Sequence, residues 1–171
     1  MSSPATRMFV VAIAVLALSR WLPHPPNFTP LVAAALFSGA ICRDWRLALA
    51  LPLGAMLLAD LWLGLHATLA FVYLGLALAV AVGRGLGSRR QPGLLLGAGT
   101  LGAVLFFLVS NFGVWLTQAL YPHTAAGLAA CYLAALPFFA NTLLATLLWV
   151  AVLFGGERWL AARGQRAVDP V

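Results

Sequence analysis

Long apolar runs, interrupted by short breaks that carry arginine, constrain this chain more than any other feature. The 171 residues are 63% hydrophobic and only 8% charged, whereas a soluble domain carries about 25% charged residues. Such a chain lacks the polar surface that a protein in water needs, so we predict an integral membrane protein. At about 20 residues for each spanning helix, six spans fit the length once loops are allowed for.

The apolar runs predict an all-α fold, a polytopic bundle of six transmembrane helices in a single membrane domain, residues 1–171. The expected helices cover about 6–22, 30–42, 47–63, 66–83, 93–118 and 128–155. The second run is too short for a full span, so we expect a short, tilted or re-entrant helix there. The first run, Met8–Leu18, also resembles the core of a signal peptide, and cleavage after Ser19 is an alternative.

All ten basic residues are arginines, and their positions predict an orientation. With six spans, nine of the ten lie at one end of the bundle and only Arg20 at the other. The positive-inside rule makes the arginine-rich end cytoplasmic, together with both chain termini. The net charge of +6 is then a matter of orientation, and we expect no nucleic-acid partner.

A proline-rich segment, Arg20–Pro30, connects the first two predicted helices at the end opposite to the other arginines. Proline fixes φ and removes a backbone donor, so this segment cannot continue a helix. We therefore predict a stiff, extended connector. Because a stiff segment loses little entropy on binding, His24–Thr29 are expected to cap a ligand pocket lined by the fifth and sixth helices.

Further polar and aromatic residues are expected at the same end. Asp60 is the only acid inside a predicted apolar segment, and a carboxylate at membrane depth needs a partner, for which Arg20 is the candidate. Phe107, Asn111 and Trp115 recur on one helical face, and aromatic walls with a few amides suit a planar organic ligand. The candidate binding residues are Arg20, His24, Asn27, Phe28, Asp60, Phe107, Asn111, Trp115, Tyr121, Cys131, Phe138 and Asn141.

Structural interpretations of these residues are alternatives. Arg20 and Asp60 can pair solely to join two helices, and Asn111 can form a bond across a helix interface. Pairs such as Gly93 with Gly97, and Ala35 with Gly39, have the spacing of close helix contacts. The two cysteines are not at metal-ligand spacing, so we expect no metal site and no disulfide, and no cofactor is indicated.

Several segments resemble an uncharacterised family of small bacterial inner-membrane proteins: LPHPPNFTP (22–30), ALFSGA (35–40), ADLWLG (59–64), SNFGVWL (110–116) and YPHTAAGLAACYLAALPFFANTLL (121–144). That family is similar to the substrate-binding S components of energy-coupling factor (ECF) vitamin transporters. The resemblance implies a location in the bacterial inner membrane and an S-component-like fold. It also implies a vitamin or other micronutrient bound near the outer face, partly under the connector.

One feature departs from the S components, which commonly present an AxxxA spacing on the first helix for docking to energising transporter subunits. Here Leu16 follows Ala12, and Leu18 follows Ala14, at that spacing. A solitary transporter is therefore an alternative to one driven by such subunits.

The sequence favours an integral membrane protein that binds and transports a small molecule and is not an enzyme. The alternative is a structural membrane protein that acts through partner proteins, like those of the rod-shape machinery. A third interpretation is an intramembrane thiol enzyme that uses Cys131 with His24 or His123 and Arg20. The chain has no HExxH or GxSxG motif and no ATP-binding loop, so it cannot hydrolyse ATP by itself.

Overall fold

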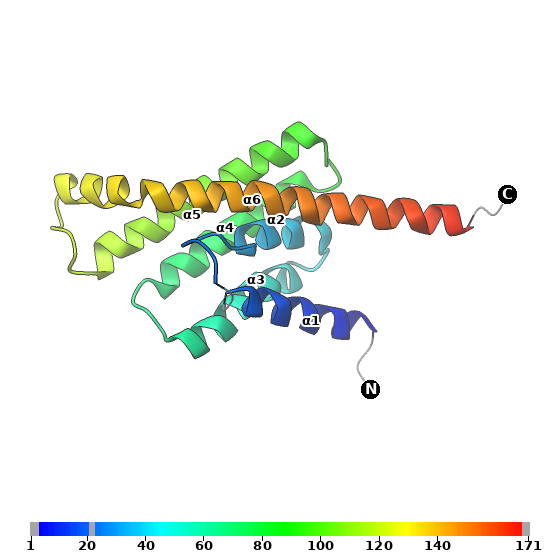
Figure 1. Cartoon of the computed structure of the whole chain (residues 1–171), viewed down its shortest axis with the longest axis horizontal. Coiled ribbons are helices and arrows are strands. Elements are labelled where there is room, and N and C mark those ends of the chain that lie inside the picture. Colours follow the sequence, from blue (N-terminus) through cyan, green and yellow to red (C-terminus); the bar gives the residue numbers. More distant parts are fainter. Residues whose placement is uncertain (1–3, 21–22, 169–171) are drawn as a thin grey trace.

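The computed structural model describes residues 4–20 and 23–168. In chain order the elements are α1 (Pro4–Ser19), α2 (Leu31–Ile41), α3 (Trp45–Leu63), α4 (Leu69–Leu86), α5 (Pro92–Thr117) and α6 (Ala125–Val168) (Figure 1). No strand occurs in these ranges. The predicted all-α fold with six helices is thus confirmed.

Four of the described helices, α3 to α6, are long and apolar enough to cross a membrane. The other two are shorter: α1 has 16 residues and α2 has 11. At 1.5 Å per residue, α2 is about 16 Å long, half of a typical hydrocarbon core. The chain is therefore a helical membrane protein in which α2 is too short to span, in line with its short apolar run.

Local sequence explains how the long helices begin and end. Asp44 caps α3, because its carboxylate accepts a hydrogen bond of 2.8 Å from the Arg46 backbone N–H. The same helix stops at Gly64, whose φ of 105° is open to glycine and strained for other residues. Pro92 begins α5, at a position where a backbone N–H would have no helical partner.

The short helix α2 lies at the centre of the bundle, where it packs against α3, α4, α5 and α6. Residues 31–36 are at most 5% exposed. All of them are apolar, and a helix that is apolar on every side is buried on every side. The Ser38 hydroxyl in the next turn donates to the Ala48 carbonyl at 2.8 Å and so ties α2 to α3.

The backbones of α2 and α4 touch at two glycines. A Cβ added to Gly39 would lie 2.1 Å from the Val80 carbonyl oxygen, and one added to Gly83 would lie 1.9 Å from the Leu36 carbonyl oxygen. A backbone oxygen cannot move aside without its helix, so both positions require glycine.

The small-residue pairs of the sequence differ in outcome. The close contact expected at Ala35 and Gly39 is confirmed, since both are buried and Gly39 meets α4. Gly93 and Gly97 have the same spacing but make no such contact, because no described atom lies within 4 Å of a Cβ added to either. Spacing alone does not say which face of a helix meets a neighbour.

The connector between α1 and α2 is bent. The Phe28 N–H donates to the Pro25 carbonyl at 3.0 Å and closes a turn around Pro26 and Asn27. Asn27 has a φ of 63°, which asparagine tolerates better than most residues, and the preceding proline suits the second position of such a turn. The prediction of an extended segment is therefore wrong for residues 25–28, where the prolines stiffen a turn.

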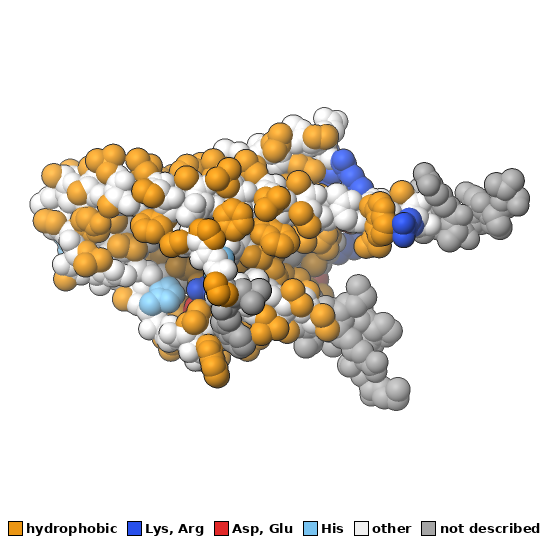
Figure 2. Space-filling view, viewed as in Figure 1, with side chains coloured by type: hydrophobic (Ala, Val, Ile, Leu, Met, Phe, Trp, Pro, Cys, Tyr) orange, Lys and Arg blue, Asp and Glu red, His pale blue; other side chains and the backbone are white. Residues whose placement is uncertain are grey.

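One end of the bundle gathers most of the positive charge, as the sequence predicts, and we call it the arginine end (Figure 2). Its described side chains are those of Arg43, Arg46, Arg84, Arg89, Arg90, Arg158 and Arg163. Arg84 donates to the Arg43 carbonyl at 2.8 Å, and Arg90 pairs with Glu157 of α6. Helix α6 continues past these contacts to Val168, beyond the expected end near residue 155, and projects from the bundle (Figure 1).

Exposed tryptophans mark the two ends of α3. Trp45 is 57% and Trp62 is 74% exposed. Their 17-residue separation corresponds to about 25 Å along the helix, close to the thickness of a hydrocarbon core. Because tryptophan favours the membrane–water boundary, this spacing supports α3 as a span.

The contact between α2 and α4 predicts unequal effects of two neighbouring substitutions. Gly83→Ala should destabilise the protein by at least about 2 kcal/mol, because the new Cβ collides with backbone. The control is Gly85→Ala, two residues further along α4. No described atom lies within 4 Å of the added Cβ, so this variant should be as stable as the wild type or slightly more stable. Thermal unfolding of both variants in detergent would measure the difference, and equal melting temperatures would refute the contact.

Candidate functional site

A buried carboxylate lies where α1, α3 and α4 meet. Asp60 is 1% exposed, and its Oδ1 is 3.7 Å from Arg20 Nη1 at the end of α1. Its Oδ2 is 3.8 Å from His66 Nε2 and accepts a hydrogen bond of 3.3 Å from the Tyr73 hydroxyl. We call these four residues the Asp60 cluster. The ion pair between Arg20 and Asp60 that the sequence predicts is confirmed.

The Asp60 cluster is loosely bonded for a charge at membrane depth. Removal of a carboxylate from water costs several kcal/mol unless a cation and hydrogen bonds compensate it. Here Arg20 supplies the charge at a distance longer than a hydrogen bond, while it also contacts the Met56 sulfur. A guanidinium has five N–H donors, and the Arg20 side chain is 21% exposed, so it has donors left for a further acceptor.

A cavity of about 220 Å³ adjoins this cluster, and we call it the connector cavity. It is lined by Arg20, Asn27, Thr29, Leu31, Val32, Met56, His66, Val72, Leu76, Phe106 and Thr142. Its walls therefore combine polar side chains with a larger apolar surface. Figure 2 shows basic, acidic and histidine atoms together in a hollow of an otherwise hydrophobic face.

The connector meets α6 halfway along the bundle. Asn141 Nδ2 donates to the Pro26 carbonyl at 3.0 Å. Asn141 is 16 residues, about 24 Å, from the first residue of α6 and equally far from Glu157 at the arginine end. The connector thus lies deeper than the outer face that the sequence suggests, because α1 and α2 are too short to bring it to the end of the bundle.

The N-terminus of α2 opens onto the connector cavity. Its first two residues, Leu31 and Val32, line the cavity, and the N-cap residue, Pro30, makes no side-chain capping bond. The first N–H groups of a helix have no helical partner, and the helix dipole makes this end positive. With Arg20 beside it, this end offers donors to an anionic group.

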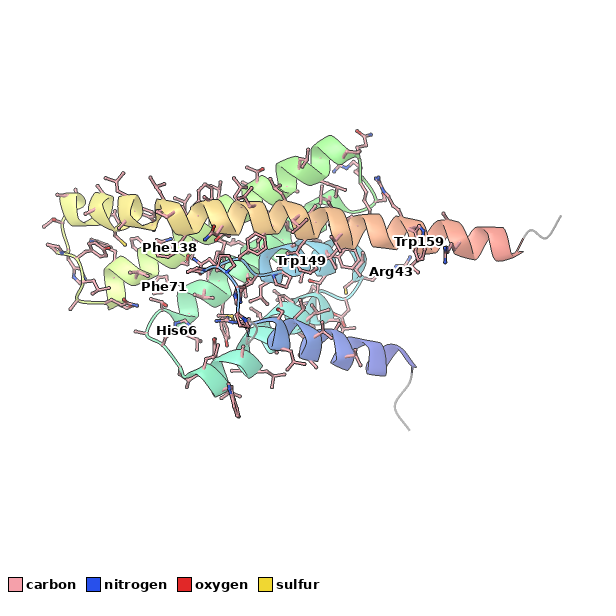
Figure 3. All side chains as sticks on the ribbon, in the orientation of Figure 1. Arg43, His66, Phe71, Phe138, Trp149 and Trp159 are labelled. Carbon is pink, nitrogen blue, oxygen red and sulfur yellow. The ribbon has the colours of Figure 1, made fainter. Side chains whose placement is uncertain are left out.

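Other predicted residues surround a second cavity of about 260 Å³, which we call the α5–α6 cavity. Its lining includes Asn111, Tyr121, Cys131 and Phe138. Asn111 Nδ2 donates to the Phe107 carbonyl at 2.9 Å, and Cys131 Sγ lies 3.5 Å from the Asn111 carbonyl. Figure 3 shows Phe138 far along α6 from Trp159 of the arginine end. The α5–α6 cavity and the connector cavity have no described lining residue in common.

Two of the predicted aromatic residues contact neighbouring protein groups. The Phe107 ring packs against those of Tyr132 and Phe139 of α6, with centroids 5.6 and 4.8 Å apart. Trp115 Nε1 donates to the Pro122 carbonyl at 3.0 Å and so holds the α5–α6 loop. These contacts favour a role of both residues in joining α5 to α6.

The structure thus divides the predicted residues. Arg20 and Asn27 line the connector cavity, Asp60 lies beside it, and His24 and Phe28 lie on the connector. Asn141 holds the connector from α6. Thr29 was expected only as part of the connector that caps the pocket, and the candidate list lacked Leu31, Val32, Met56, His66, Val72, Tyr73, Leu76, Phe106 and Thr142. Of these, Tyr73 has a recognisable signal, since it is the one tyrosine in the apolar run 66–83.

Fold and site together define a helical membrane protein with an internal cavity beside a buried ion pair. The chain belongs to a family of unknown function, DUF6580, which matches residues 2–168. No curated protein and no solved structure matches the chain. Within the described ranges, no group of three or more His, Cys, Asp or Glu side chains is placed to hold a metal ion.

The Asp60 cluster predicts a charge-balance effect on stability. Arg20→Gln should lower the free energy of unfolding by about 3 kcal/mol, because it leaves a buried carboxylate without its cation. The double variant Arg20→Gln with Asp60→Asn should recover most of this loss, since no charge is left to compensate.

Arg89→Gln is the matched control, because the Arg89 side chain is exposed and, among the described groups, bonds only the Gly85 carbonyl. Thermal unfolding in detergent would compare the four proteins. A double variant less stable than Arg20→Gln alone would contradict the assignment of Arg20 as the compensating charge.

Proposed function

We propose that this protein binds a small organic molecule, a vitamin or other micronutrient, in the connector cavity and takes part in its uptake across the bacterial inner membrane. The observation that carries the proposal is a cavity with both polar and apolar walls at half the depth of the bundle, covered by a bent, proline-stiffened connector. Small-molecule sites combine these features: apolar area for affinity and a few polar groups for orientation.

The size of the cavity favours a small ligand. Its volume of about 220 Å³ is below the range of roughly 300–1,000 Å³ that is usual for drug-sized compounds. A single ring system with a short substituent suits this volume. Phe106 supplies an aromatic wall, and Asn27, Thr29 and His66 supply hydrogen-bonding groups.

The charges around the cavity favour a ligand that carries a carboxylate or phosphate group. Arg20 and the first two residues of α2 line the cavity, and arginines and helix N-termini bind anions. Transporters place helix N-termini at the bilayer midplane for this purpose. The position of α2, half a membrane thickness long and at the level of Asn141, agrees with that arrangement.

We further propose that the arginine end is cytoplasmic, with both termini on that side, and that the ligand enters from the opposite end. The concentration of arginine supports this orientation. The resemblance to S components that the sequence motifs suggest is the reason for proposing an uptake role without catalysis. The exposed small and apolar residues of α1, such as Ala14 and Leu18, form a shallow hollow with Trp62 of α3, which is a candidate surface for an energising subunit.

A structural role through partner proteins is the second candidate, and the projection of α6 favours it. Trp159 and Leu160 are more than half exposed on this helix beyond the bundle. If this role is correct, substitutions in the connector cavity should leave growth and partner assembly unchanged, whereas truncation of α6 should impair them.

Ligand binding can be tested by native mass spectrometry of the protein purified in detergent, with thermal-shift assays against a panel of anionic vitamins. We expect a co-purifying compound, or a stabilising vitamin. Val72→Trp, which fills the connector cavity, should weaken binding at least tenfold. Leu74→Trp adds the same ring to an exposed position of α4 and should bind like the wild type. Equal binding by both variants would refute the site.

Orientation can be tested with single introduced cysteines. Burial raises the pKa of the Cys42 thiol at the end of α2, so little reactive thiolate forms there at neutral pH. In a background without Cys42 and Cys131, Ala126→Cys should react with a membrane-impermeant maleimide in intact cells. Ser88→Cys, at the arginine end, should react only after permeabilisation, and the reverse pattern would invert the orientation.

A further inference from the structure

A groove on the surface of α5 and α6 near the arginine end combines apolar walls with a charged mouth. Its volume is about 250 Å³, and we call it the α5–α6 groove. Leu95, Leu96, Leu147, Val150 and Phe154 form its walls, and Arg158 lies at its edge. It is distinct from the α5–α6 cavity, which lies toward the opposite end of the same helices.

The geometry of the two helices keeps this groove open. Figure 1 shows α5 crossing α6 at an angle, and the groove lies between the first residues of α5, from Pro92, and residues 147–158 of α6. On α6, a Cβ added to Gly155 or Gly156 would have no described atom within 4 Å. The groove is therefore formed where two helices diverge and where one of them has no side chain to fill the space.

The two arginines near the groove differ in their ion pairing. Arg90 lies over the Phe154 ring, 5.8 Å from its centroid, but it is paired with Glu157. Arg158, in contrast, is exposed and has no acidic partner among the described residues. One guanidinium at the mouth of an apolar groove is thus available for an anion.

We propose that the α5–α6 groove holds an anionic phospholipid, with an acyl chain along the leucine and phenylalanine walls and the headgroup phosphate at Arg158. Basic sites between membrane helices bind such headgroups, and guanidinium binds phosphate through paired hydrogen bonds. Cover by a helix that brings no acid would leave Arg158 unpaired, which is costly at a membrane boundary. A phosphate supplies the missing negative charge.

Native mass spectrometry tests the proposal with protein from mixed micelles of phosphatidylglycerol and phosphatidylcholine. Wild type should retain phosphatidylglycerol preferentially, and Arg158→Gln should reduce that preference about fivefold. Arg89→Gln removes an equal charge at the same end but outside the described lining, and it should keep the preference. Gly155→Leu fills the groove in open space and should reduce retention of both lipids.

Three results would overturn the proposal. The first is unchanged lipid preference in Arg158→Gln with unchanged retention in Gly155→Leu. The second is equal binding of soluble glycerol phosphate, which would mark a headgroup site without a role for the groove. The third is a dimer that dissociates in Gly155→Leu, which would assign the groove to a second copy of the chain. Each result is independent of whether the connector cavity binds a ligand.

Discussion

The close contact of α2 with α4 determines where the cavity lies. A side chain at Gly39 of α2 would collide with the backbone of α4, and a side chain at Gly83 of α4 would collide with the backbone of α2. Because both positions are glycine, α2 packs closely against α4 toward the arginine end. Because α2 has only 11 residues, it extends through only about half of a membrane thickness at the bundle centre. The connector and members of the Asp60 cluster line the connector cavity together with the first residues of α2.

The buried ion pair of the Asp60 cluster is not explained by stability alone. A buried ion pair adds little net stability, because desolvation offsets the attraction of its charges. Replacement by apolar residues would hold α1 and α3 together as well or better. Arg20 also lines the connector cavity, so under the proposed function Asp60 would keep a cation at membrane depth for the ligand.

Composition and arginine placement were sufficient to predict the helices, their number and the charged end, because the bilayer restricts a chain to few solutions. The pairing of Arg20 with Asp60 followed from the same restriction. The division into two cavities did not, since it depends on how helices rotate and cross. Two adjacent residues of α5 illustrate this dependence: Phe106 lines the connector cavity, whereas Phe107 packs on α6. Periodicity identifies a face of a helix but not the neighbour that it meets.

The proline-rich connector has a physical reason to lie at membrane depth. Non-helical backbone is tolerated there only where its polar groups are satisfied or face a cavity. Pro23, Pro25, Pro26 and Pro30 have no N–H to satisfy. The N–H groups of Phe28 and Thr29 bond carbonyls within the connector, and Asn141 bonds the Pro26 carbonyl. A segment rich in proline can thus turn at membrane depth with few unsatisfied N–H groups, while Asn27 and Thr29 line the connector cavity.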